Sequence, residues 1–167
     1  LVHTLLMDKG YEYIPKPTGR PISQERGYER TYLSPGGVLL DIHTGFCQQQ
    51  RVGLCYTSLW ERTGPDNTGV FPTTQALSAE DTALFLAIHL AQDCFQGPFR
   101  QWIDLAWWMQ TQSLNMNVMV QRAKQAGAGT LLWSALARLS FLRPESVPGS
   151  REWETLRPSG PRGIYLE

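Results

Sequence analysis

The chain has 167 residues, of which 42% are hydrophobic and 18% are charged, and its formal net charge is zero. This composition is typical of a folded domain with a hydrophobic core, alone or with a tail. A zero net charge gives no reason to expect nucleic-acid binding. No apolar run approaches the roughly 20 residues that span a membrane. The three cysteines lack the CxxC spacing of a zinc site, and we expect a cytoplasmic protein.

The first 77 residues predict a small sheet with helices. Residues 1–9 are expected to form a helix that ends at Gly10, followed by a short strand over 11–14. Strands over 29–33 and 38–44 flank the turn sequence Ser34-Pro35-Gly36-Gly37 and should pair as a hairpin. A short helix with Trp60 as its anchor is expected over 54–62, and one short strand near 70–71. The predicted class is α+β, with a small mixed or antiparallel sheet.

Residues 78–142 predict four helices that pack as a small bundle. Ser78 is a suitable N-cap for the first, and Asn115 or Asn117 for the third. In the second helix, the residues at inward spacing are Trp102, Ile103, Ala106 and Met109. Residues 143–167 are rich in proline and glycine, and we expect an extended tail that is flexible unless a partner or the domain surface holds it. The sequence thus predicts three regions, 1–77, 78–142 and 143–167.

The strongest candidate for chemistry is the segment Gly37-Val38-Leu39-Leu40-Asp41-Ile42-His43. Its apolar residues suit a buried strand, and strand alternation places Asp41 and His43 on one face. A carboxylate and an imidazole at the end of a strand can bind a metal or position a reacting group. The alternative is a strand end that reaches water, with Asp41 capping a turn.

A second set of candidates lies in the helical region. His89 and Asp93 are four residues apart and could share a metal or a substrate, but the third ligand of a zinc site is missing nearby. We therefore favour a structural role for His89. Asp104 either forms a surface ion pair with Arg100 or is partly buried and paired with Arg100 or His89. Trp107-Trp108 is either core or a surface on which a ligand stacks.

Several short segments follow one another in an informative order. They are Lys9-Gly10-Tyr11, Leu40-Asp41-Ile42-His43, Leu59-Trp60-Glu61-Arg62, Leu77-Ser78-Ala79-Glu80-Asp81, Ile88-His89-Leu90-Ala91 and Trp102-Ile103-Asp104-Leu105-Ala106. In this order and spacing, residues 1–142 resemble the later part of the uncharacterised nucleotidyltransferase family, within the DNA polymerase beta-like nucleotidyltransferase superfamily. No single segment is specific to that family; the ordered combination carries the resemblance.

The resemblance implies transfer of a nucleotidyl group from an NTP to an acceptor. In that superfamily three carboxylates hold divalent metal, two of them in a GS…DxD signature. Asp41 would be the third carboxylate and a Mg²⁺ ligand, and His43 would lie near the nucleotide or the acceptor. This chain has no GS…DxD signature. The nucleotidyltransferase-like fold is therefore expected to be incomplete in this chain or degenerate, with weak or no binding of Mg²⁺ and NTP by these residues alone.

Two other classes of function are compatible with the sequence. The chain could be a noncatalytic binding or assembly module, in which the aromatic-rich helical region forms a homo-oligomer or binds a partner chain. It could also be a metal-dependent hydrolase that uses Asp41, His43, His89 and Asp93. The sequence identifies neither the acceptor nor the preferred nucleotide, and it gives no reason to expect a membrane or nucleic-acid partner.

Overall fold

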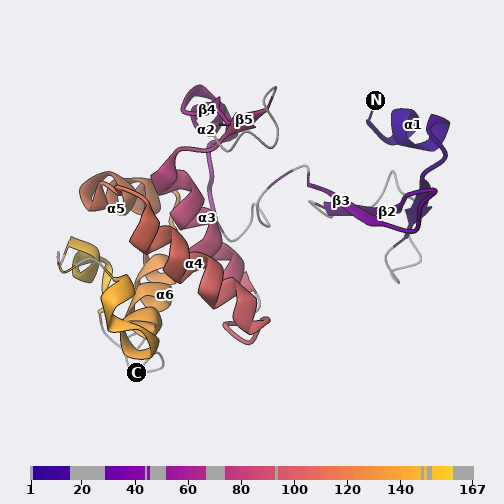
Figure 1. Cartoon of the computed structure of the whole chain (residues 1–167). Coiled ribbons are helices and arrows are strands. Elements are labelled where there is room, and N and C mark those ends of the chain that lie inside the picture. Colours follow the sequence, from indigo (N-terminus) through magenta and orange to yellow (C-terminus); the bar gives the residue numbers. More distant parts are fainter. Residues whose placement is uncertain are drawn as a thin grey trace. The chain divides into compact units, whose positions relative to one another are not determined.

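The computed structural model describes residues 2–15, 29–43, 45, 52–66, 74–92, 94–147, 149 and 152–159. The chain forms two compact units, Leu1–Gln48 and Gln49–Glu167. The first contains a helix and a three-stranded sheet, and the second is mainly helical (Figure 1). The predicted α+β class is confirmed. Residues 78–142 and the described part of 143–167 belong to the same unit.

The first unit begins with helix α1 (Val2–Asp8). The helix ends where Gly10 adopts a φ of +79°, a conformation that costs glycine little. The amide of Gly10 donates to the carbonyl of Met7, and that of Tyr11 donates to Leu6, both at 3.0 Å. This is the hydrogen-bond pattern of a glycine C-cap, so the predicted helix end is confirmed.

Three antiparallel strands follow, in the order β1 (Glu12–Ile14), β2 (Glu29–Leu33) and β3 (Leu39–His43). The β2–β3 turn is closed by a bond from the Gly37 amide to the Ser34 carbonyl at 2.9 Å, and Gly37 has a φ of +79°. The Ser34 hydroxyl accepts a further bond from the Val38 amide at 2.9 Å. The predicted hairpin is confirmed.

The two faces of the sheet differ. On one face Tyr32 is buried, and its hydroxyl lies 3.2 Å from Nδ1 of His3 on α1. The ring of Tyr13 lies 5.5 Å from that of Tyr32. On the other face Leu39 is exposed, as is Val38 in the turn before it. The prediction of a buried strand is therefore wrong for the described residues, because one short helix covers one face only.

The second unit begins with helix α2 (Tyr56–Glu61) and a small ribbon of β4 (Gly64–Pro65) and β5 (Gln75–Ala76). Leu59 is the buried residue of α2, whereas Trp60 is exposed. The prediction that Trp60 anchors this helix is wrong, because neighbouring positions on a helix point about 100° apart and Leu59 takes the inward one. The predicted strand near 70–71 lies outside the described residues.

Four longer helices form the core of this unit: α3 (Ala79–Gln92), α4 (Phe99–Thr111), α5 (Met116–Gln125) and α6 (Gly129–Leu142). Helix α3 contacts each of the other three (Figure 1). Five of its apolar residues are buried: Ala83, Leu84, Ala87, Ile88 and Leu90. The predicted caps at Ser78 and Asn115 are confirmed, since each side-chain oxygen accepts a bond from the amide three residues on.

In helix α4, one residue that was predicted to face inward faces outward. Its buried residues are Trp102, Leu105, Ala106 and Met109, at spacings of three and four. Ile103, predicted to face inward, is exposed, because Leu105 completes the inward stripe instead. The opposite side of α4 therefore carries large apolar side chains.

The described part of the C-terminal region is folded rather than extended. It contains two short 3-10 helices, η2 (Pro144–Ser146) and η3 (Glu152–Leu156), and η3 contacts α5 and α6. Trp153 and Leu156 are buried there, which stabilises this segment by about 2 kcal/mol per large apolar side chain. The expectation of an extended tail is therefore wrong for residues 152–156. Among the described residues, no helix combines the length and apolar character needed to cross a membrane.

Candidate functional site

Asp41 lies on β3 directly opposite Thr31 of β2. The hydroxyl of Thr31 donates a 2.6 Å hydrogen bond to Oδ1 of Asp41, on the exposed side of the hairpin. This bond fixes the orientation of the carboxylate. Within the described part of the chain no hydrogen bond to the other oxygen, Oδ2, is present, and the Asp41 side chain is exposed.

His43 lies two residues further along β3, opposite Glu29. Directly paired residues share a face, so Glu29, Thr31, Asp41 and His43 lie on the same side of the sheet. The predicted placement of Asp41 and His43 on one face is confirmed. Glu12 of β1 lies on this side too, opposite Leu33, and we refer to this side as the open sheet face.

The open sheet face carries the acidic residues Glu12, Glu29 and Asp41 but does not form a closed metal site. Among the described residues, no group of three His, Cys, Asp or Glu side chains is arranged to hold a metal ion. Asp41 therefore contributes one oriented carboxylate, and the face by itself lacks the several hard oxygen ligands that Mg²⁺ takes.

The other candidate residues lie in the second unit. The ring of His89 stacks on that of Phe85, with centroids 5.9 Å apart and planes 24° from parallel. The side chain of Asp93 lies outside the described residues. Asp104 is exposed, so the alternative in which it is partly buried is wrong. His89 belongs to the second unit, whereas Asp41 and His43 belong to the first.

Trp107 and Trp108 have different surroundings. The indole of Trp108 is half-buried and donates a 2.9 Å bond to the carbonyl of Ala79, at the start of α3. The indole of Trp107 is exposed. Of the pair, Trp108 therefore contacts α3 through its indole, whereas Trp107 is largely open to solvent.

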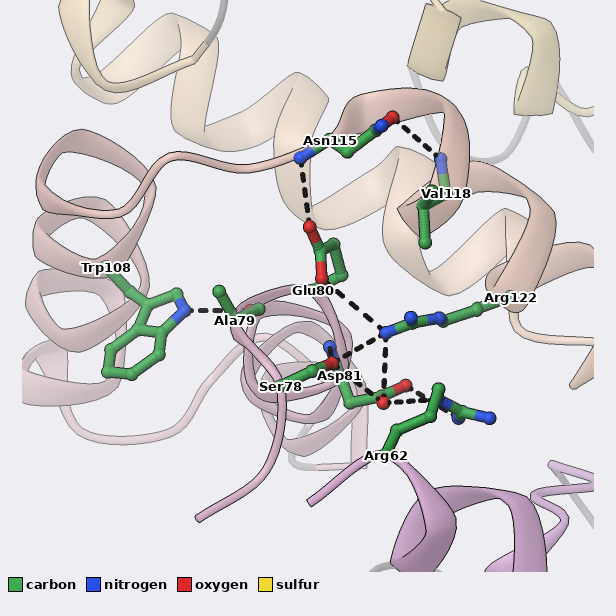
Figure 2. A network of polar contacts seen from close by, with 9 residues as sticks. All are labelled: Arg62, Ser78, Ala79, Glu80, Asp81, Trp108, Asn115, Val118 and Arg122. Atoms are coloured by element: carbon green, nitrogen blue, oxygen red, sulfur yellow. Dashed lines mark hydrogen bonds and ion pairs between the residues drawn. The ribbon is translucent and has the colours of Figure 1, made fainter. Parts of the chain in front are cut away.

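A buried carboxylate organises the second unit. Asp81, in the first turn of α3, is only 3% exposed (Figure 2). Arg62 donates from Nε to Oδ2 at 2.8 Å and from Nη2 to Oδ1 at 3.0 Å. Oδ2 also accepts a bond from the Ser78 hydroxyl at 2.9 Å, and Nη1 of Arg122 lies 3.0 Å away. Arg62, Ser78, Asp81 and Arg122 are called the Asp81 network below.

The charge state of Asp81 follows from these contacts. Its burial acts to raise the pKa, but the hydrogen bonds from Arg62 and Ser78 and the charge of Arg122 outweigh burial and lower the pKa. A carboxylate that stays ionised and is surrounded by donors is a poor general base. The Asp81 network is therefore a structural connection between the end of α2, the start of α3 and the middle of α5.

Glu80 extends this connection to the start of α5. One of its oxygens accepts a 3.1 Å bond from the Asn115 amide, and the other lies 3.6 Å from Nη1 of Arg122 (Figure 2). The sequence identified Ser78 as a cap and Asp81 as an acid in the first turn. It gave no sign of the pairing with Arg62 or Arg122, which are 19 and 41 positions from Asp81.

Comparison with known families is informative at this point. A family model described as an uncharacterised nucleotidyltransferase matches residues 1–142. The chain belongs to this family. The matched residues include both the strand of Asp41 and the Asp81 network. Because the match starts at residue 1, it does not support the prediction that only the later part of the nucleotidyltransferase domain is present. No curated protein and no solved structure matches the chain.

Proposed function

We propose that this member of the uncharacterised nucleotidyltransferase family transfers a nucleotidyl group from an NTP to an acceptor, and that Asp41 is one of the carboxylates that bind the divalent metal. The observation that carries the proposal is the family match, which covers the strand of Asp41. In such a transfer an acceptor oxygen bonds to the α-phosphorus, the bond to the β-phosphate oxygen breaks, and pyrophosphate leaves. The proton of the acceptor passes to a base or to solvent.

The local chemistry of Asp41 supports a ligand role. Thr31 holds one carboxylate oxygen by a 2.6 Å bond, and the Asp41 side chain is exposed. A hard anionic oxygen is the kind of ligand that Mg²⁺ prefers. His43 lies two positions along the same strand, about 7 Å away, and would contact the nucleotide or the acceptor.

The described residues do not complete a metal site on their own. Two Mg²⁺ ions that bridge nucleotide phosphates require several oxygen ligands that converge from neighbouring strands. The open sheet face supplies one oriented carboxylate, and the chain has no GS…DxD signature. We therefore propose Asp41 as a contributor to the metal site rather than as its sole ligand.

The test follows the transfer of label from NTPs that carry it on the α-phosphate. The complete product of the reading frame is incubated with each of the four NTPs, Mg²⁺ and fractions of a cell extract, and both labelled acceptor and released pyrophosphate are measured. Asp41→Asn should abolish transfer, whereas Asp8→Asn, a matched change of an exposed aspartate at the end of α1, should leave it intact. Circular dichroism confirms that both variants fold. The absence of transfer from any NTP, or transfer that persists in Asp41→Asn, would contradict the proposal.

A further inference from the structure

The outward side of α4 carries a row of large apolar side chains. Phe99, Ile103 and Trp107 are 68%, 50% and 56% exposed, and they follow one another at intervals of four residues. Residues at this interval form a ridge along a helix. We call these three side chains the α4 ridge. Single exposed apolar residues are common, but a continuous ridge of three large ones is typical of an interaction surface.

Two opposite charges accompany this ridge. Arg100 follows Phe99 and Asp104 follows Ile103, so both charges lie on the same flank of the α4 ridge, one turn apart. Both side chains are exposed, and neither has an ion-pair partner among the described residues. Along α4, the positive charge of Arg100 therefore precedes the negative charge of Asp104 beside the apolar ridge.

We propose that the α4 ridge binds the same ridge of a second copy of this chain, in an antiparallel arrangement about a two-fold axis near Ile103. Such an axis places Phe99 of one copy against Trp107 of the other, and Ile103 against its own equivalent. The two-fold axis is perpendicular to the two antiparallel helices and lies in the plane between them. The flank of one α4 that carries Arg100 and Asp104 therefore meets the same flank of the other α4. Arg100 of each copy then lies near Asp104 of the other, so both charges gain partners.

This charge order is the reason to choose a second copy as the partner. The surface is complementary to itself, which is the requirement of a two-fold interface. A partner of a different sequence would have to carry a matching apolar ridge, with a negative charge near Arg100 and a positive charge near Asp104. The proposal does not depend on nucleotidyl transfer, since it concerns only contacts on α4.

The area involved predicts a weak association. The exposed parts of the three ridge residues amount to on the order of 300 Å² per copy, since a large aromatic side chain contributes about 150–250 Å² in total. Stable interfaces bury about 800 Å² per partner. Dimerisation should therefore depend on protein concentration.

The first experiment is sedimentation equilibrium of the chain at concentrations from micromolar to near millimolar. The natural chain should show a monomer–dimer equilibrium. Ile103→Asp, which brings two carboxylates together at the axis, should weaken the dimer by more than about tenfold. Phe141→Asp is the matched control, because Phe141 is 86% exposed on α6, and it should leave the equilibrium unchanged. A natural chain that stays monomeric throughout, or a dimer unaffected by Ile103→Asp, would overturn the proposal.

The second experiment exchanges the charges. Arg100→Glu gives an α4 flank with two negative charges, and Asp104→Arg gives one with two positive charges. Each variant alone should be monomeric, and a mixture of equal amounts should form a mixed dimer that weakens with added salt. Circular dichroism verifies that each variant is folded before mixing. If the single variants dimerise as well as the natural chain, or if the mixture remains monomeric, the antiparallel two-fold contact is wrong.

Discussion

Arg62 and Asp81, 19 positions apart in the chain, form a two-point ion pair in which Nε and Nη2 of the guanidinium lie 2.8 and 3.0 Å from the two carboxylate oxygens. The pair connects the residue after α2 to the first turn of α3. Because Arg122 of α5 reaches the same carboxylate at 3.0 Å, three elements depend on one buried side chain. The first predictions concern this dependence.

Asp81→Asn should lower the free energy of unfolding by about 2–4 kcal/mol, because it removes the carboxylate that pairs with Arg62 and leaves Arg122 with Glu80 alone. The effect should be smaller than for a fully buried pair, since the side chain of Arg62 is 32% exposed. Urea denaturation measures the change. Asp104→Asn, at an exposed position on α4, should change stability by less than about 0.5 kcal/mol. Equal stabilities of the natural chain and Asp81→Asn would contradict the structural role of the network.

The stability of the protein should also depend on pH through Asp81. Its pKa in the folded state lies below the ordinary value of 3.8, so the unfolded chain takes up a proton first as the pH falls. Asp81 therefore makes its full contribution to the free energy of unfolding above the ordinary pKa of 3.8, and this contribution is lost as the pH falls through the lower pKa of the folded state. The stability difference between the natural chain and Asp81→Asn should be constant near neutral pH and should shrink below pH 3.8. A difference that stays constant to pH 2 would argue against an ionised Asp81.

The two neighbouring tryptophans should respond differently to mutation. Trp108→Phe should lower the free energy of unfolding by about 1–2 kcal/mol, because the indole loses its 2.9 Å bond to the Ala79 carbonyl. Trp107→Phe should change stability little and should remove a large part of the fluorescence that iodide can quench. Paired denaturation and quenching measurements check both expectations. If Trp108→Phe leaves the melting temperature unchanged, the packing of Trp108 on α3 is unimportant.

The 167-residue chain alone should bind Mg²⁺-ATP weakly or not at all. The described residues supply one oriented carboxylate, and a metal held together with phosphates needs several. Isothermal titration calorimetry should give heats that are indistinguishable between the natural chain and Asp41→Asn. A tight complex that is lost in Asp41→Asn would mean that other acids of this chain complete the site.

Local signals in the sequence predicted much of the fold. The helix end at Gly10, the Ser34–Gly37 turn and the cap at Ser78 each depend on residues within a few positions of one another. The placement of Asp41 and His43 on one face follows from strand alternation alone. These features could be predicted because short-range backbone geometry determines them.

Features that depend on distant parts of the chain could not be predicted in this way. Ile103 and Trp60 were assigned inward positions from hydrophobicity, but the packing of neighbouring helices selected Leu105 and Leu59. The ion pairs of Asp81 join residues far apart in sequence, and no local pattern indicates them. A metal site is equally non-local, so the sequence could suggest Asp41 as one candidate ligand and could not indicate which other residues would join it.

The central claim, that Asp41 binds the divalent metal used in nucleotidyl transfer, is tested most directly by changing the ligand atom. In the complete product of the reading frame, Asp41→Cys should abolish transfer with Mg²⁺, because a thiolate is a poor ligand for a hard cation. Transfer should return when Mg²⁺ is replaced by Mn²⁺ or Cd²⁺, which accept sulfur ligands more readily, and Asp41→Asn should stay inactive with all three metals. Transfer by Asp41→Cys with Mg²⁺ at the rate of the natural protein would show that Asp41 does not contact the metal.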